Sequence, residues 1–309
     1  MKIATIALVA SGSALAFAQS QDPLAPRPNG MSPATPATHL IVNATVHTSP
    51  GNVLEDTDIL IVDGKVAAVG TDLKPGNAQV WDIDGAHIYA GFIDPYIEVD
   101  TPDLPSGETG THWSNKITPQ DNALRVGLGD DAAKSLREMG FTTAMIAPDA
   151  GIFRGWTAIV STAADFEEDS LGDPPIYQSN AGQAMGFDRG GWGDPGYPTS
   201  HMGVVALMRQ TFADADTRRA SKHADSNILD HVNPNSTTYY YNISQELEAA
   251  LADDIANEFN HPRIVIVDNG TAHRRLDLFK EMGHPVVVPL LPRDARCLLR
   301  GRDGRCGPR

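Results

Sequence analysis

Two apolar, β-branched runs near the end of the chain constrain its fold more than any other feature. The runs RIVIVD (263–268) and HPVVVPLL (284–291) flank TAHRRLDLFKEMG (271–283), whose apolar residues have helical spacing. Two strands joined through a helix pair in parallel, and a parallel sheet is covered on both faces, so its strands are apolar throughout. This segment is therefore predicted to form a β-α-β unit.

The same alternation extends upstream. Strands are predicted at Ile88–Ile93, at 141–148 and at 155–162, and helices at 121–140, 201–219 and 243–259. Gly140 is suited to end the first helix, and Thr199 and Ser200 to cap the second. The stretch AGQAMGFDRGGWGDPGYP (181–198) is predicted to be a loop. Strands that alternate with helices predict an α/β fold in which helices cover a parallel sheet.

Before this part, residues 39–85 have a different texture. The segments LIVNATVHT (40–48), DILIVDGKVAAVG (58–70) and AQVWDIDGAHIYAG (78–91) are rich in β-branched residues and separated by turns. Asp63-Gly64 between two apolar runs is typical of a tight hairpin. We expect a small β-domain here, followed by the α/β part at 86–292.

The two ends of the chain differ from both domains. Lys2 precedes an apolar run that closes with Ala16-Phe17-Ala18, so residues 1–18 are interpreted as a signal peptide for the periplasm or secretion, with no membrane span after its removal. Residues 19–38 form a Pro-rich linker. Residues 293–309 hold both cysteines and are predicted to be a disordered basic tail. A net charge of -15 argues against a nucleic-acid surface.

The segments IVNATVHT, DILIVDGKVAAVG and the strand ending in GFID (91–94) together resemble the start of the amidohydrolase superfamily. The similarity covers roughly residues 39–290 and is closest to a secreted bacterial branch of imidazolonepropionase-like proteins. This resemblance implies a small β-domain before a metal-binding (β/α) barrel. It also implies a divalent zinc, manganese or iron ion and hydrolysis of carbon–nitrogen bonds, other than peptide bonds, in a small-molecule substrate.

The segment AGFIDPYIEVD (90–100) departs from the family pattern Asp-x-His-x-His, because Tyr96 and Glu98 stand at the two histidine positions. Alternate residues of a strand share a face, and barrel sites lie at the carboxyl ends of strands. Glu98 can supply an oxygen ligand. A neutral Tyr96, with an ordinary pKa near 10, is a poor substitute for imidazole. We therefore expect this chain to lack an intact metal site.

Other candidate residues are weaker. Asp268 is the one carboxylate that directly follows a predicted later strand, which makes it a weak metal candidate. Trp192 and Tyr197 are weak candidates for a substrate pocket, with packing of their loop as the alternative. Several acidic residues at 94–103 could also supply the paired carboxylates that glycosidases use. This interpretation is less favoured. None of the histidines in the second half of the chain directly follows a predicted strand. They are His201, His223, His231, His261, His273 and His284.

The barrel is predicted to be incomplete. Five strands are recognisable between Ala86 and Pro292, whereas a full barrel needs eight. The prediction is thus a partial TIM-type (β/α) barrel preceded by a small β-domain, truncated or frame-altered near residue 292, with open edges that favour association. The predicted function is that of an amidohydrolase-family hydrolase; the alternative is a catalytically inactive binding or scaffold protein.

Overall fold

The computed structural model describes residues 38–102, 104, 111–163, 176–189, 196–221, 225–233, 237–261 and 263–289. The predicted signal peptide at 1–18, the tail at 293–309, Trp192 and His223 lie outside these residues. The chain divides into two compact units between Ala90 and Gly91. Each unit is described by itself.

The first unit is a five-stranded β-sheet, as its turn-rich sequence predicts. Asp63 and Gly64 both have positive φ, 50° and 72°, between β2 and β3, which confirms the tight hairpin expected there. The core of this unit is small and centres on Ala44, Val46 and Ile59. The strands are β1 Thr38–Ser49, β2 Asn52–Val62, β3 Lys65–Gly70, β4 Gln79–Asp82 and β5 His87–Tyr89, with β3-β2-β1-β4 as the order and β5 also paired to β1.

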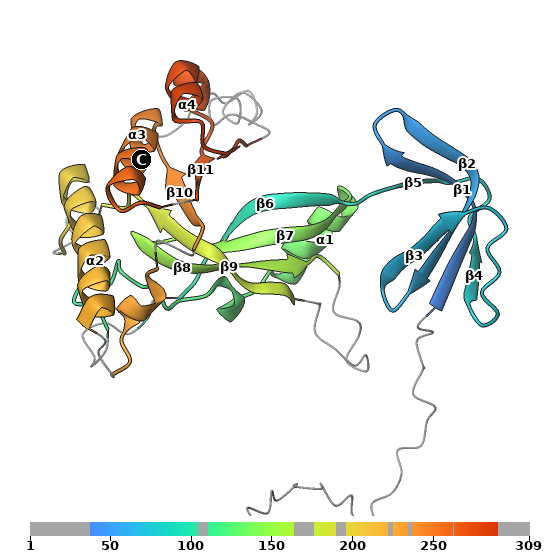
Figure 1. Ribbon diagram of the computed structural model, residues 1–309, viewed down its shortest axis with the longest axis horizontal. Helices are drawn as coiled ribbons and strands as arrows, with labels where there is room; N and C mark the ends of the chain where they lie inside the picture. Colours follow the sequence, from blue (N-terminus) through green and yellow to red (C-terminus); the bar gives the residue numbers. More distant parts are fainter. Residues whose placement is uncertain are drawn as a thin grey trace, which may run out of the picture. The chain divides into compact units, whose positions relative to one another are not determined.

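The second unit is a curved sheet of seven strands with helices packed against it (Figure 1). The spatial order runs from β12 through β11, β10, β9, β8 and β7 to β6. Its strands are β6 Phe92–Val99, β7 Phe141–Pro148, β8 Phe153–Ser161, β9 Ile176–Gly186, β10 Tyr239–Ile243, β11 Ile264–Asp268 and β12 Val286–Val287. Its helices are α1 Asp130–Glu138, α2 His201–Ser221, α3 Glu246–Glu258 and α4 Leu276–Met282, with short 3₁₀ turns η1 Ala123–Arg125, η2 Ile228–His231 and η3 Ala272–Arg275.

One strand breaks the predicted parallel pattern. β8 pairs antiparallel with both β7 and β9, whereas the other neighbours in this sheet are parallel. Only residues 149–152 join β7 to β8. A parallel pair needs a crossover of about a dozen residues. A link this short therefore makes an antiparallel hairpin. The expectation of a purely parallel sheet was wrong at this place.

The strand predicted at Ile88–Ile93 was wrong, because β5 ends at Tyr89 and β6 begins at Phe92 in the other unit. Two strands were missed by the sequence analysis. β10 has the sequence YYYNI, and its last residue had been assigned to the following helix. β9 includes residues 181–186, which had been predicted to be a loop because of Gly182 and Gly186. A Cβ at Gly182 would lie 2.5 Å from the Tyr240 ring, and one at Gly186 would lie 2.5 Å from the Arg154 guanidinium. These glycines therefore serve close packing inside a strand rather than a turn.

Two of the helices follow the sequence prediction closely, but the first, predicted at 121–140, is confined to α1 and preceded by the 3₁₀ turn η1. The Ser200 hydroxyl accepts a hydrogen bond from the Gly203 amide at 3.2 Å and caps α2, as expected. Gly140, with φ 89°, follows the end of α1. The main core lies between β8–β11 and the helices α2 and α3, and Phe212 of α2 is fully buried in it. The fold class, a partial (β/α) barrel and a separate small β-domain, is confirmed.

The sheet curls far enough for its first strand to reach its fifth. Asn242 on β10 donates to Glu98 on β6 at 2.6 Å, although β7, β8 and β9 lie between these strands in the sheet. The rings of Tyr96 and Tyr240 lie 6.1 Å apart across the same interior. Side chains from distant parts of the sequence thus meet inside the curled sheet.

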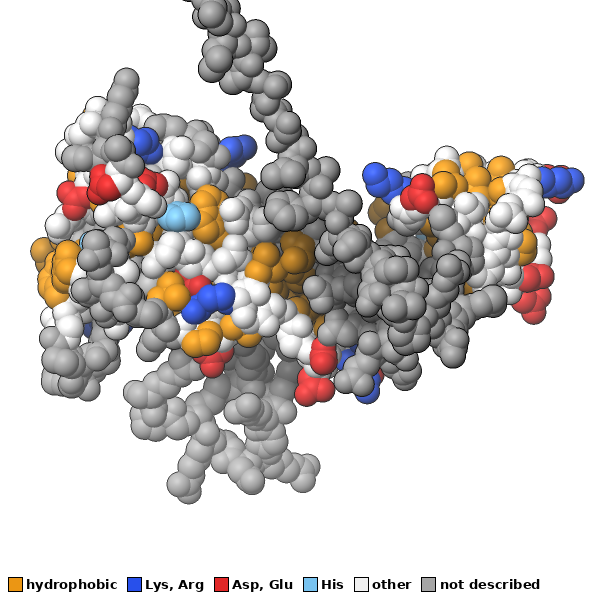
Figure 2. Space-filling model, turned by 90° about the horizontal axis from the view of Figure 1, so that it is seen from below, with side chains coloured by type: hydrophobic (Ala, Val, Ile, Leu, Met, Phe, Trp, Pro, Cys, Tyr) orange, Lys and Arg blue, Asp and Glu red, His pale blue; other side chains and the backbone are white. Residues whose placement is uncertain are grey.

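Two surface properties bear on the predicted partners. In the described part of the chain, every helix is too short or too polar to cross a lipid bilayer. On the face shown in Figure 2, Lys and Arg side chains form separate spots instead of one continuous basic surface. This distribution agrees with the acidic composition of the chain.

Candidate functional site

Polar and charged side chains from four of the seven strands converge at one end of the curled sheet, which we call the barrel mouth. Its members are Tyr96 and Glu98 of β6, Arg154 of β8, Asp188 just after β9 and Asn242 of β10. β6, β9 and β10 contribute residues from their carboxyl ends. β8 contributes from its amino end, because it runs the opposite way. The carboxyl ends of barrel strands are where such folds place their ligands.

Arg154 is the centre of the mouth, and only 7% of its side chain is exposed. Its Nη1 donates to Glu98 Oε1 at 2.6 Å, its Nε donates to the Gly151 carbonyl at 3.3 Å, and its Nη2 lies 3.6 Å from Asp188 Oδ2. Burial alone lowers the pKa of Arg154, but the Tyr96 phenol, once it ionises at high pH, and the carboxylates of Glu98 and Asp188 outweigh it and raise the pKa above its usual value. The guanidinium therefore stays charged.

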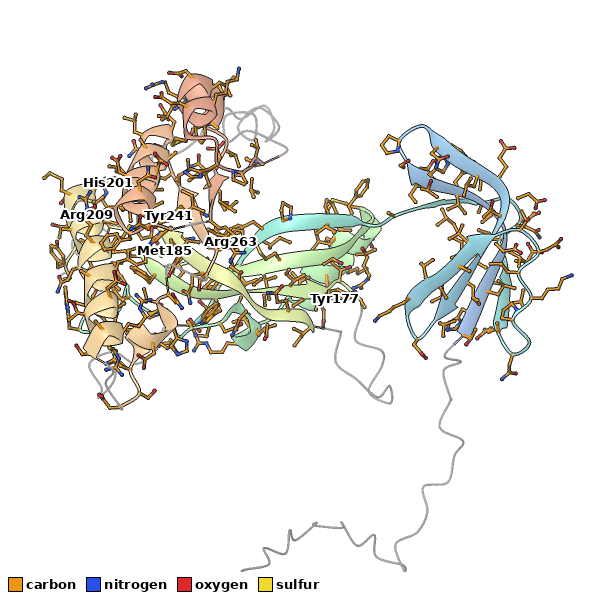
Figure 3. The ribbon with its side chains drawn as sticks, in the orientation of Figure 1. Tyr177, Met185, His201, Arg209, Tyr241 and Arg263 are labelled. Carbon is orange, nitrogen blue, oxygen red and sulfur yellow. The ribbon has the colours of Figure 1, made fainter. Side chains whose placement is uncertain are left out.

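The strand beneath Arg154 is shaped to receive it. Gly182, Ala184 and Gly186 alternate along β9, and the two glycines leave the space that Tyr240 and Arg154 occupy. The residues between them, Gln183 and Met185, are buried on the opposite face of the strand. Figure 3 shows Met185 next to Tyr241 of β10, its partner in the sheet register. Small residues on one face of β9 thus make room for a charged group inside the sheet.

Tyr96 contributes a hydroxyl group without a hydrogen-bond partner. Its ring is partly exposed, but its hydroxyl oxygen is buried and makes no hydrogen bond to any described residue. Burial raises the pKa of Tyr96 to about 12, against the lowering effect of the nearby Arg154 charge. The hydroxyl is therefore protonated at neutral pH and can donate a hydrogen bond.

The metal ion implied by the family resemblance does not fit these residues. Tyr96 is neutral, and Glu98 Oε1 already accepts from both Arg154 and Asn242. The buried guanidinium also repels a second cation at this position. Across the ranges that the structure describes, no three His, Cys, Asp or Glu side chains lie close enough together to hold a metal ion. The mouth is organised around an internal cation instead.

The other sequence candidates lie apart from this set. Asp268 is the last residue of β11 and is buried; its carboxylate accepts from the amides of Gly270, Thr271 and Ala272, so it caps its own loop. Tyr197 donates to the Gly203 carbonyl at 3.1 Å, and its ring lies 6.1 Å from that of Trp113. Local structure therefore accounts for both Asp268 and Tyr197.

The described histidines also have local partners or surroundings. His201, at the start of α2 in Figure 3, lies 3.4 Å from the buried Glu248 carboxylate, which accepts from the amide of Ser244 at 2.6 Å. His284 lies 2.7 Å from Asp253. The His261 ring lies among aromatic side chains, 4.9 Å from Tyr239 and 4.5 Å from Phe212. None of these histidines belongs to the mouth.

Sequence reasoning missed Arg154, Asp188 and Asn242. One signal was available for Arg154, since a single charge between Phe153 and Gly155 in an otherwise apolar strand must be paired inside the fold. The small-residue alternation of β9 was a second signal, which the reading of 181–198 as a loop concealed. The positions of Asp188 and Asn242 at the mouth depend on the curl of the sheet, which local sequence patterns do not encode.

Comparisons with known proteins agree with this fold. No family model matches the chain. It is 38% identical over 65 residues to a D-hydantoinase of Geobacillus stearothermophilus (21% of this chain, 13% of that protein) and 33% identical over 70 residues to a dihydroorotase of Pelotomaculum thermopropionicum (23% and 16%). It is 28% identical over 185 residues to an adenine deaminase of Paracoccus denitrificans (57% and 29%). The chain thus spans less than a third of each of these relatives.

A solved structure extends the similarity to most of the chain. An amidohydrolase from Thermotoga maritima superimposes with a TM-score of 0.61 at 22% identity, covering 82% of this chain and 70% of that one. At this identity the match establishes the fold alone. Together with the hydantoinase and dihydroorotase similarities, it supports the resemblance to the amidohydrolase superfamily that the first strands predict.

Proposed function

We propose that this chain is a member of the amidohydrolase superfamily that hydrolyses a carbon–nitrogen bond, other than a peptide bond, in a small molecule held at the barrel mouth. The relatives named above are a hydantoinase, a dihydroorotase and a deaminase, all of which act on carbon–nitrogen bonds. The observation that carries the proposal is the convergence of Glu98, Arg154, Asp188 and Asn242 at the end of the sheet where barrels hold their ligands.

Glu98 is the residue best placed to act on water. Both of its hydrogen bonds go to Oε1, so Oε2 accepts none from the described residues, and 42% of the side chain is exposed. As a general base, Oε2 would take a proton from water as the water oxygen bonds to the carbon of the substrate. The carbon–nitrogen bond then breaks, and the leaving nitrogen recovers that proton. This scheme uses only side chains that the mouth contains.

A second candidate is a protein that binds its ligand without hydrolysis. The observation that favours it is the fixed position of Glu98, because its carboxylate is already bonded to both Arg154 and Asn242. Such a protein would use the same mouth as a recognition site. The absence of turnover combined with saturable binding would distinguish it from the hydrolase.

The finer placement is also a proposal. We infer that the chain belongs to the secreted, imidazolonepropionase-like branch with a degenerate metal site, and that residues 1–18 direct it to the periplasm or outside the cell. An exported protein that begins at Gln19 would support this, whereas an exported protein that keeps Met1 would contradict it. Association through the end strands β6 and β12 is a further expectation, which sedimentation can test.

The decisive experiment for the function is a turnover assay on the full chain. Hydantoin, dihydroorotate and adenine are offered to protein as purified, to protein treated with a chelator, and to the variant Glu98→Gln. We expect hydrolysis of at least one compound that survives chelation and falls about 100-fold or more in the variant, the size of a general-base contribution. No turnover of any of the three by intact protein would contradict the hydrolase and favour the binding protein.

A further inference from the structure

The barrel mouth presents hydrogen-bond acceptors to solvent. Glu98 Oε2 is free among the described residues, as noted above. Asp188 uses Oδ2 for the Gly151 amide at 3.1 Å and for the Arg154 guanidinium, which leaves Oδ1 without a hydrogen bond in the part of the chain that is described. The Asp188 side chain is 47% exposed. Two carboxylate oxygens from different strands are thus available to an incoming molecule.

Several donors of the mouth are already engaged. Arg154 donates to Glu98 and to the Gly151 carbonyl, and the Asn242 amide donates to Glu98. The Tyr96 hydroxyl and the remaining N–H groups of Arg154 can still donate, but Arg154 is held between Glu98 and Asp188. A ligand that brings its own N–H groups would find open acceptors.

Two buried atoms near this end of the sheet lack a well-formed hydrogen bond to the described residues. They are the Tyr96 hydroxyl, which lies beside Arg154 and Asn242, and Asp149 Oδ1, just beyond the end of β7. An unsatisfied buried polar group costs about 1–3 kcal/mol of folding free energy, so natural proteins rarely keep one without a hydrogen-bond partner. Tyr96 lies beside Arg154, whose charge acts on its hydroxyl.

The charge of the mouth sets the sign of its ligand. Arg154 is its one buried cation, while Glu98 and Asp188 are anions that contact it, and Asp149 adds a carboxylate at the same end of the sheet. Carboxylates outnumber the guanidinium. An anionic ligand would meet net repulsion in a partly desolvated place, whereas a cation or a neutral N–H donor would not.

We propose that the barrel mouth binds a cationic small molecule rich in N–H groups, such as an amidine or a guanidine. Its N–H groups donate to Glu98 Oε2 and Asp188 Oδ1. Arg154 holds both carboxylates in place in the role of an internal cation, and carboxylate-bearing ligands are disfavoured. This inference rests on the proposed function only in using the same site, because binding can occur without turnover.

The test is calorimetric titration of the full chain with three probes of different charge: benzamidine as the cation, hydantoin as the neutral ureide and dihydroorotate as the anion. We expect benzamidine to bind at least about tenfold more tightly than dihydroorotate, a difference of about 1.4 kcal/mol. Hydantoin should lie between them. Glu98→Gln and Asp188→Asn should each weaken benzamidine binding by about tenfold or more.

A matched control is Glu258→Gln, which removes an exposed carboxylate of α3 that pairs with Arg209 of α2 away from the mouth. It should leave benzamidine binding unchanged. Tighter binding of dihydroorotate than of benzamidine, equal effects of all three variants, or no saturable binding of any probe would each overturn the proposal. Binding of benzamidine without turnover of any substrate would leave this proposal standing and contradict only the hydrolase.

Discussion

The strands β8, β9 and β10 carry opposite chemistry on their two faces. On the face that meets α2 and α3, Phe153, Met185 and Tyr241 are fully buried in an apolar core. One residue further along the same strands, Arg154, Gly186 and Asn242 form the barrel mouth. Because side chains of a strand alternate between faces, a shift of one position separates the core that stabilises the fold from the site that carries charge.

This contrast teaches that the two faces should respond to different perturbations. The core face depends on volume and on exclusion of water, so truncation and protonation there should change stability. The mouth depends on charge and on close backbone approach, so changes there should alter ligand binding more than stability.

The largest effect is expected from Phe212→Ala in the core. The Phe212 ring is fully buried and lies 5.0 Å from Phe153 and 5.5 Å from Tyr239. Its removal leaves a cavity and should lower the free energy of unfolding by about 3–5 kcal/mol, measured by urea denaturation. Met202→Ala on the same helix, where the side chain is 85% exposed, should stay within about 0.5 kcal/mol. Equal losses in both variants would mean that α2 does not pack as described.

The second effect is a loss of stability in acid that comes from His261. Burial lowers the pKa of His261 to about 4 in the folded chain, whereas the unfolded chain has an ordinary value of about 6.5. Above pH 6.5 both states are neutral and His261 adds no pH dependence. As the pH falls from about 6.5 to about 4, only the unfolded state gains the proton, so stability should fall by up to about 3 kcal/mol.

Unfolding curves across this pH range, compared between the intact chain and His261→Phe, isolate the contribution of this ring. The variant should lose the part of the pH dependence that begins near pH 6.5. The same slope in both proteins would show that His261 is accessible to protons in the folded chain.

An intermediate effect is expected from Gly186→Ala at the mouth. The new Cβ would lie 2.5 Å from Arg154 Nη2, and the ion pairs with Glu98 and Asp188 keep the guanidinium from moving freely. We expect a loss of about 1–2 kcal/mol in stability and a larger loss in benzamidine affinity. Gly76→Ala, which has nothing within 4 Å of its Cβ, is the control. Unchanged binding in Gly186→Ala would contradict the placement of Arg154 over β9.

The smallest effect is expected from Tyr96→Phe. This change removes a buried hydroxyl that has no hydrogen-bond partner among the described residues, so it should leave stability within about 1 kcal/mol, on the stabilising side. The same variant should weaken ligand binding if the hydroxyl donates to the ligand. A clear destabilisation, seen in thermal unfolding, would show that the hydroxyl is already bonded.

Much of the fold was readable from the sequence, and the reason lies in local patterns. The β-domain, the hairpin at Asp63-Gly64, the cap at Ser200 and the β-α-β unit from β11 to β12 are each encoded by local sequence patterns. The antiparallel β8 and the strand β9 were missed. The length of the 149–152 link was overlooked, and the glycines of β9 have a tertiary cause, the bulk of Tyr240 and Arg154.

The candidate site was only half readable. Tyr96 and Glu98 were identified because they interrupt a recognisable motif, and strand alternation placed both on the inner face. Their partners come from β8, β9 and β10, up to 144 residues away along the chain. The pairing of Glu98 with Arg154 depends on the antiparallel turn of β8, which the sequence analysis had not predicted.

The pairing of Glu98 with Arg154, in place of a metal ion, is the central claim, and zinc retention tests it most directly. The full chain is loaded with zinc, dialysed to equilibrium and analysed for metal beside Glu98→Gln. The account predicts that both proteins retain the same amount, well below one equivalent, because the guanidinium already neutralises Glu98. One equivalent of zinc retained by the intact chain and lost in Glu98→Gln would contradict it, and would show that the mouth opens its ion pair to hold a metal.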